Sequence, residues 1–178
     1  LAQAKNLAGG DRLIVHLRQY PEAVLKGLQT IAATTRRFVA AAIETGIDGL
    51  FYAVQHAQAG LLTLDEYKTF GLPFDTISLE PAQGLWCNML HLHGKDIYFS
   101  LLTSSLSFPI VNWHDRETPP SLRETSKVLQ AVCGGLRQET VVLGTPDELR
   151  KEAADAIEQT KGRRFILGTG CVTPITAP

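Results

Sequence analysis

The sequence has 178 residues, a formal net charge of −1 and a hydrophobic fraction of 44%, which is enough for one packed domain. The near-neutral charge provides no basic face, so nothing in the composition favours binding to nucleic acid. The apolar runs are far shorter than the ~20 residues of a membrane-spanning helix, and we expect neither a membrane span nor a signal peptide.

The cysteines and the two ends of the chain indicate its setting. Three cysteines are an odd number at unpatterned spacing, which argues against a disulfide framework and favours a reducing, cytoplasmic location. The chain begins at Leu1 without a methionine and stops at Pro178, straight after a strand-and-loop signal. We therefore expect a fragment of a longer protein. No linker or second composition zone divides it, so residues 1–178 are expected to form a single domain.

Two helices are expected before the first strand, after a weak lead-in over residues 1–10. The helical spacing of Leu13 and Leu17 predicts a helix over residues 11–19. Pro21 then predicts the start of a longer helix, which Gly46 ends. The apolar stripe of that helix is expected to contain Val24, Leu28, Ile31, Phe38, Ala42 and Ile43.

Five apolar segments are typical of strands in a parallel sheet that is covered on both faces. They are residues 48–54, 86–93, 108–113, 129–133 and 164–168. Further helices are expected over residues 96–104 and from Thr145 to about residue 159. Capping boxes, in which a hydroxyl and a carboxylate satisfy the first free amides of a helix, begin at Thr63, Ser121 and Thr145. This alternation of strands and helices predicts an α/β fold of repeated βαβ units.

Most histidines and cysteines lie at or just past the C-terminal end of a predicted strand. In a parallel α/β barrel these strand ends meet at one mouth, where catalytic groups gather. Cys87 lies instead at a strand start and is expected to be inert core. The residues at strand ends are His56, His91, His93 and His114, together with Cys133 and Cys171.

His91 and His93 are two residues apart on a predicted strand, so their side chains point to the same face. With Cys171 they would supply two imidazole nitrogens and one thiolate. A fourth position open to substrate or water would then suit a catalytic zinc ion. The alternative is that one histidine is a buried polar residue, the other caps a loop, and Cys171 packs as a small residue in a glycine-rich turn.

Four polar residues in a row follow the third predicted strand. Among them His114, like His56, is a candidate for moving protons, and Asp115 could orient an imidazole or bind a substrate cation. Arg116, and Arg137 after the next strand, are candidates for holding an acidic group of the substrate through paired N–H groups. The alternative is a solvated loop held by salt bridges.

At these residues the chain resembles the uroporphyrinogen decarboxylase superfamily. That superfamily also contains zinc-dependent thiol methyltransferases that take methyl groups from corrinoid proteins. The resemblance implies a (β/α)8 barrel, of which this chain would hold the last five strands and lack the first three strands and the final helix. The matching segments, in the right order, are GIDGLFY (46–52), YKTFGLPF (67–74), LHLHG (90–94), VNWHD (111–115), CGGL (133–136) and FILGTGC (165–171).

The resemblance implies a site closer to the methyltransferases than to the decarboxylases. The decarboxylases place a serine where this chain has Ala57 and a histidine where it has Thr169, and their catalytic arginine and aspartate precede the part of the barrel matched here. The methyltransferases carry His-x-Cys where this chain has His91 and His93, and a further cysteine where it has Cys171. The exchange of one thiolate for an imidazole leaves a less negative, harder site.

We therefore expect an enzyme that holds zinc on His91, His93 and Cys171 and activates a substrate thiol to attack a methyl donor. One rival function is metal-free decarboxylation of uroporphyrinogen III in porphyrin biosynthesis, and another is a non-catalytic barrel that binds a corrinoid or a tetrapyrrole. The expected partners are small-molecule substrates, a corrinoid protein and a second copy of the chain, because five strands of a barrel leave two open edges. The expected substrate-binding residues are Tyr52, Arg116, Arg137 and Thr169.

Overall fold

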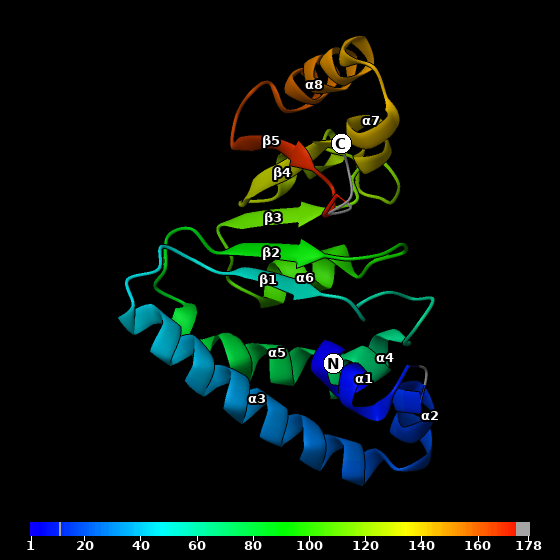
Figure 1. Ribbon diagram of the computed structural model, residues 1–178, viewed down its shortest axis with the longest axis vertical. Coiled ribbons are helices and arrows are strands. Elements are labelled where there is room, and N and C mark those ends of the chain that lie inside the picture. Colours follow the sequence, from blue (N-terminus) through cyan, green and yellow to red (C-terminus); the bar gives the residue numbers. More distant parts are fainter. Residues whose placement is uncertain (11, 174–178) are drawn as a thin grey trace.

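Five parallel strands form one sheet in which each strand pairs with its neighbour in the sequence, in the order β1-β2-β3-β4-β5. This computed structural model describes residues 1–10 and 12–173, with the backbone alone at 126 and 127. All five arrows point the same way in Figure 1, so their C-terminal ends lie along one side of the molecule. The strands are β1 (Phe51–Val54), β2 (Met89–Leu92), β3 (Ile110–Trp113), β4 (Ala131–Leu136) and β5 (Phe165–Thr169).

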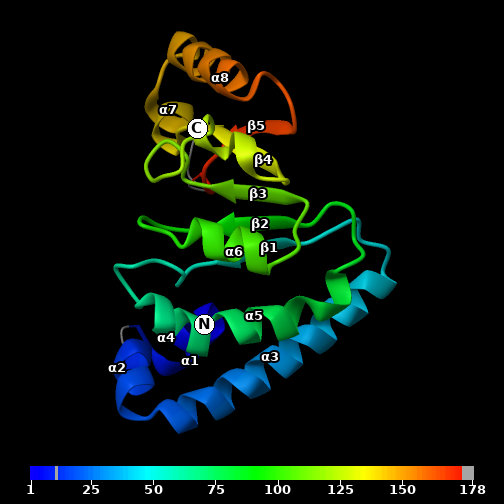
Figure 2. The same cartoon turned by 180° about the vertical axis from the view of Figure 1, so that it is seen from behind.

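Helices pack against one face of this sheet and beyond its β1 edge. In Figure 2, α6 lies in front of β1 and β2, while the N-terminal helices and α5 lie below them and α8 lies beside β4 and β5. The α-helices are α1 (Ala2–Ala8), α2 (Arg12–Gln19), α3 (Pro21–Glu44), α4 (Leu64–Phe70), α5 (Leu72–Leu79), α6 (Phe99–Ser105), α7 (Gln138–Leu143) and α8 (Pro146–Thr160). Two short 3-10 helices are η1 (Glu80–Ala82) and η2 (Glu124–Lys127).

The pairing register assigns alternate residues of each strand to opposite faces of the sheet. One set points toward the helices and is buried, as at Leu90, Val111 and Trp113. The other set points to the opposite face, where Phe51 and Ile166 remain 58% and 40% exposed. One row on this second face contains the register partners Ala53, His91, Asn112, Cys133 and Ile166.

Four helices begin at or within one residue of the predicted start, and α6, expected from residue 96, begins at Phe99. The long helix α3 starts at Pro21, and the capping boxes at Thr63 and Thr145 open α4 and α8. The predicted helix over 11–19 corresponds to α2, although Asp11 lies outside the described residues. The capping-box bonds of Ser121 also form, but the 3-10 turn η2 follows them in place of an α-helix. Three helices, α1, α5 and α7, were not expected.

Two sequence predictions of local packing are wrong. Phe38 was placed in the apolar stripe of α3 but is 73% exposed, and Val39 is buried in its stead. The fourth strand was expected over 129–133, whereas β4 begins two residues later and ends three residues later, so that Cys133 lies within the strand and not at its end. Within the described residues, no helix is both long enough and apolar enough to span a membrane.

Candidate metal centre

Four side chains meet at the C-terminal side of the sheet: His91, His93, His114 and Cys171. His91 belongs to β2 and His93 follows it directly, His114 follows β3, and Cys171 lies two residues past β5. The parallel register puts these strand ends beside one another, which is how residues 80 positions apart in sequence come together. One ligand atom from each of the four lies within 4.8 Å of the others.

The distances within this group identify the atoms that face a common centre. The Cys171 Sγ atom lies 3.6 Å from His91 Nε2 and 3.5 Å from His93 Nδ1. His114 Nε2 lies 3.3 Å from His93 Nδ1. A tetrahedral zinc ion with its usual bond lengths separates two nitrogen ligands by roughly 3.3 Å and a nitrogen from a sulfur by roughly 3.5 Å. These three separations therefore match the spacing that one tetrahedral zinc ion requires, and the remaining pairs lie within 4.8 Å.

His91 is held by a partner on the neighbouring strand. Its Nδ1 lies 2.6 Å from Asn112 Oδ1, and its ring stacks on Phe51 with the ring centroids 5.3 Å apart. Because Nδ1 is engaged by Asn112, Nε2 is the nitrogen left for the centre. A second partner that fixes the ring of a metal-binding histidine is a regular feature of metal sites.

His114 has a carboxylate partner. Its Nδ1 lies 3.6 Å from Glu117 Oε1, three residues further along the chain. The carboxylate that can orient this imidazole is therefore Glu117, and not the adjacent Asp115 that the sequence suggested. With Nδ1 facing a carboxylate, Nε2 is directed toward His93 and the centre of the group.

Burial keeps two of the imidazoles neutral at physiological pH. It lowers the pKa of His91 to about 4, opposed by the hydrogen bond with Asn112 and reinforced by His114 and His93. Burial also lowers the pKa of His93, with a further lowering from His114 and an opposing effect of Glu117. Neutral imidazoles offer the lone pairs that a metal ion needs, so the group fits a cation that prefers nitrogen and sulfur ligands, such as zinc.

Comparison with known proteins identifies the family of this chain. A family model described as "Uroporphyrinogen decarboxylase (URO-D)" matches residues 4–178. The chain belongs to the uroporphyrinogen decarboxylase family. This confirms the resemblance inferred from the sequence, and the five parallel strands confirm a partial barrel of the uroporphyrinogen decarboxylase type.

A solved structure shares the fold. A methyltransferase from Methanosarcina mazei superposes with a TM-score of 0.74 and 17% sequence identity, over 93% of this chain and 48% of that one. The chain thus spans about half the length of that methyltransferase, and likeness at this level of identity concerns the fold alone. No curated protein matches the sequence.

Two other predicted site residues, Asp115 and Arg116, contact β4 and α8. Asp115 is buried and accepts a hydrogen bond of 3.0 Å from the amide of Gly135, and burial raises the pKa of its carboxyl. Arg116 donates to the carbonyl oxygens of Gly135 and Glu152 and to the carboxylate of Asp155 on α8. The expectation that Arg116 points into the mouth is corrected, because these contacts turn its guanidinium toward α8.

Arg137 and Thr169 lie near the mouth but make bonds of their own. The side chain of Arg137 is 52% exposed, with Nε 3.8 Å from Glu152 Oε1. The hydroxyl of Thr169 donates to the carbonyl of Cys171 at 2.6 Å, so it stabilises the turn that carries the thiol. A role in substrate binding remains a prediction for both residues.

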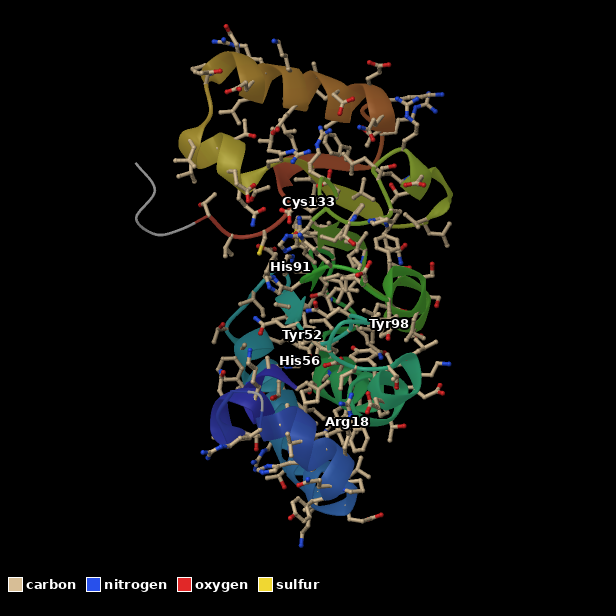
Figure 3. All side chains as sticks on the ribbon, turned by 90° about the vertical axis from the view of Figure 1, so that its right-hand side faces the viewer. Arg18, Tyr52, His56, His91, Tyr98 and Cys133 are labelled. Carbon is tan, nitrogen blue, oxygen red and sulfur yellow. The ribbon has the colours of Figure 1, made fainter. Side chains whose placement is uncertain are left out.

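Tyr52 and His56 lie on the helix side of the sheet, away from the four-residue group. Figure 3 shows them nearer the N-terminal helices than His91 and Cys133 are. Tyr52 is the register partner of Leu90, so it points to the face opposite His91, and its hydroxyl donates to Asp75 on α5 at 2.8 Å. Both residues line a pocket of about 190 Å³ between β1 and helices α1, α3 and α5. His56 was expected at the mouth, and its place in this pocket corrects that expectation, whereas a role of Tyr52 in substrate binding remains a prediction.

Sequence reasoning missed one residue of the centre and misjudged another. Asn112, which contacts His91, was read as part of an apolar strand, although an amide inside such a strand is itself a signal of a buried polar contact. His114 was assigned to proton movement, whereas its Nε2 lies within the group of ligand atoms. His91, His93 and Cys171 are brought together as the sequence predicted.

Proposed function

We propose that this chain carries the site of a metal-dependent enzyme that transfers a methyl group to a thiol. The observation that supports it is the spacing of Cys171 Sγ from the two imidazole nitrogens, 3.6 Å and 3.5 Å, which suits a shared zinc ion. Zinc would be held by Nε2 of His91, Nδ1 of His93 and Sγ of Cys171. When bound, the ion would lower the pKa of a substrate thiol and favour its thiolate form near neutral pH.

His114 would have two uses in this reaction. It is the fourth residue of the ligand group, and its Nε2 lies 3.3 Å from His93 Nδ1. A substrate thiol reaches the centre only if His114 withdraws or if the ion accepts a fifth ligand. A withdrawn His114 whose Nδ1 still faced Glu117 would have Nε2 free to accept the proton of the thiol. The proposal thereby keeps the predicted proton role of His114.

For the methyl donor and the acceptor thiol we propose only a chemical class. A corrinoid protein as donor agrees with the zinc-dependent members of the superfamily and with a fold shared with a methyltransferase. Arg137 is the predicted anion-binding residue that is still exposed near the strand ends, which favours a thiol with an acidic group.

Cobalt substitution tests the metal site with matched cysteine variants. Co²⁺ bound by a thiolate gives an intense charge-transfer absorption, so wild type loaded with Co²⁺ should show it and Cys171→Ser should lose it. Cys133→Ser is the control, because Cys133 is buried within β4 and is not one of the four ligand residues. We expect this variant to keep the band. A wild-type protein that binds neither Co²⁺ nor Zn²⁺ would sink the proposed metal site.

Activity is then measured with methylcobalamin as donor and 2-mercaptoethanol as acceptor. We expect zinc-dependent methylation of the thiol, abolished in the His91→Ala, His93→Ala double variant. The alternative that the family description itself favours is uroporphyrinogen decarboxylation. Metal-free protein that converts uroporphyrinogen to coproporphyrinogen would support that alternative. Tight corrinoid or tetrapyrrole binding without any turnover would indicate a non-catalytic barrel.

A further inference from the structure

Asn112 lies on the face of the sheet opposite the helices, the inner face, in the row of register partners that also contains His91 and Cys133. It is 3% exposed, and its side chain makes three hydrogen bonds to three different parts of the barrel. Its Oδ1 lies 2.6 Å from His91 Nδ1 on β2. Its Nδ2 donates to the carbonyl of Cys133 on β4 at 2.9 Å and to that of Thr169 on β5 at 3.0 Å.

These bonds fix which way the amide of Asn112 faces. Carbonyl oxygens only accept hydrogen bonds, so the group facing Cys133 and Thr169 must be the NH₂ group, which has two hydrogens to give. The oxygen of the amide then faces His91, and an oxygen can only accept. His91 must therefore carry its proton on Nδ1. Its Nε2 is left with a free lone pair, 3.6 Å from Cys171 Sγ.

The same amide also holds the turn that carries the thiol. Thr169 accepts from Asn112 through its carbonyl and donates from its hydroxyl to the carbonyl of Cys171 at 2.6 Å. Asn112 is thus linked to His91 directly and to Cys171 through one residue. A shift of this side chain would change the tautomer of one ligand and the position of the other.

We propose that Asn112 is the positioning residue of the metal centre, which sets metal affinity by fixing the tautomer of His91 and the placement of Cys171. The inference rests on the proposed metal site but adds a residue and a role to it. An amide is required, because aspartate would turn a second oxygen toward the carbonyls of Cys133 and Thr169. Because its partner is a neutral amide, His91 is also a weaker electron-pair donor to the metal than His114, whose Nδ1 faces the carboxylate of Glu117. A weaker ligand leaves the bound cation more electrophilic.

The chain offers a matched control in Asn88. It is also 3% exposed, its Oδ1 accepts from the amide of Leu50 at 3.0 Å, and its Nδ2 donates to the carbonyl of Ala82 at 2.6 Å. Asn88 directly precedes β2, at the end of the sheet opposite the metal centre. Asn88→Leu and Asn112→Leu both remove a buried amide of the same size, and only the second removes it from the site.

Two measurements on the purified 178-residue chain test the proposal. In metal-free protein, ¹⁵N chemical shifts of the imidazoles report the tautomer, with the His91 signal assigned by its loss in His91→Gln. We expect Nδ1 of His91 to be protonated in wild type and in Asn88→Leu, and the tautomers to be mixed in Asn112→Leu. Zinc affinity by chelator competition should fall about 10- to 100-fold in Asn112→Leu and stay within about threefold of wild type in Asn88→Leu.

Asn112→Asp separates the two halves of the role and serves if Asn112→Leu fails to fold. Its carboxylate still accepts from His91, so the tautomer should be kept, while the lost bond to Thr169 should weaken zinc binding. Zinc affinity unchanged in both Asn112 variants, or a wild-type His91 protonated on Nε2, would overturn the proposal. Because the tautomer is read without metal, this result is distinguishable from failure of the proposed methyl transfer.

Discussion

His56 is 4% exposed, and within the part of the chain that the structure describes its Nδ1 has no hydrogen-bond partner. Burial lowers the pKa of this imidazole to about 4, with smaller effects of the charges at the N-terminus and Lys5. The unfolded chain takes up a proton near pH 6.5, whereas the folded chain resists it down to about pH 4. The stability that the neutral form of His56 contributes is therefore fully present above pH 6.5 and is lost as the pH falls toward 4.

This sign leads to a prediction for His56→Gln. A side chain that cannot titrate should reduce the difference in unfolding free energy between pH 7 and pH 5 by about 2 kcal/mol. Urea unfolding of wild type and variant at the two pH values measures this difference, and each protein serves as its own reference at pH 7. An equal pH dependence in the two proteins would show that His56 is protonated alike in both states.

At the scale of residues, the sequence predicts the relative placement of side chains on one strand better than contacts between side chains on different elements. The alternation of His91 and His93 needs only the geometry of a strand, and it places both in the group. Arg116 was misassigned because its partner Asp155 lies 39 residues away on α8. No local sequence pattern predicts a contact over that separation. Asn112 was overlooked because its three bonds all go to other strands.

At the scale of elements, the capping box at the start of α8 provides a direct test of local stability. Thr145 accepts from the amide of Glu148, and Glu148 in turn accepts from the amide of Thr145. Thr145→Ala removes the hydroxyl and should lower the unfolding free energy by about 1 kcal/mol. Thermal unfolding followed by circular dichroism measures the loss. Thr30→Ala, in the exposed middle of α3, should be neutral or slightly stabilising, because alanine favours helix interiors.

Element boundaries followed the sequence where a side chain itself forms the boundary. The hydroxyl and carboxylate of a capping box act within four residues, so α4 and α8 start as predicted. β4 was misplaced because Gly134 and Gly135 resemble a strand terminator. Inside β4, a Cβ at Gly134 would collide with the carboxylate of Asp115, so a glycine is required there by a contact from the preceding strand end. That contact is not visible in the sequence.

At the scale of the whole molecule, the sheet ends in free edges within the described ranges 1–10 and 12–173. β1 pairs only with β2 and β5 only with β4. The match covers 48% of the methyltransferase whose fold this chain shares, so about half of that protein has no counterpart in these residues. An exposed edge of a parallel sheet is a template for pairing with another polypeptide. Phe51, 58% exposed on the inner face beside this edge, adds an apolar surface.

The free edge of β1 can be blocked without breaking the sheet. The carbonyls of Leu50 and Val54 accept from the amides of Met89 and His93, on the side of β2. Every second residue of a parallel strand turns to the same neighbour, so Ala53 turns its N–H to the open edge. Ala53→Pro removes that N–H alone, which is the position where an edge strand tolerates proline. We expect the wild-type chain to self-associate with rising concentration in sedimentation experiments, and Ala53→Pro to shift it toward monomer. Ala53→Val keeps the N–H and should associate like wild type, whereas equal association of the proline variant would place the contact elsewhere.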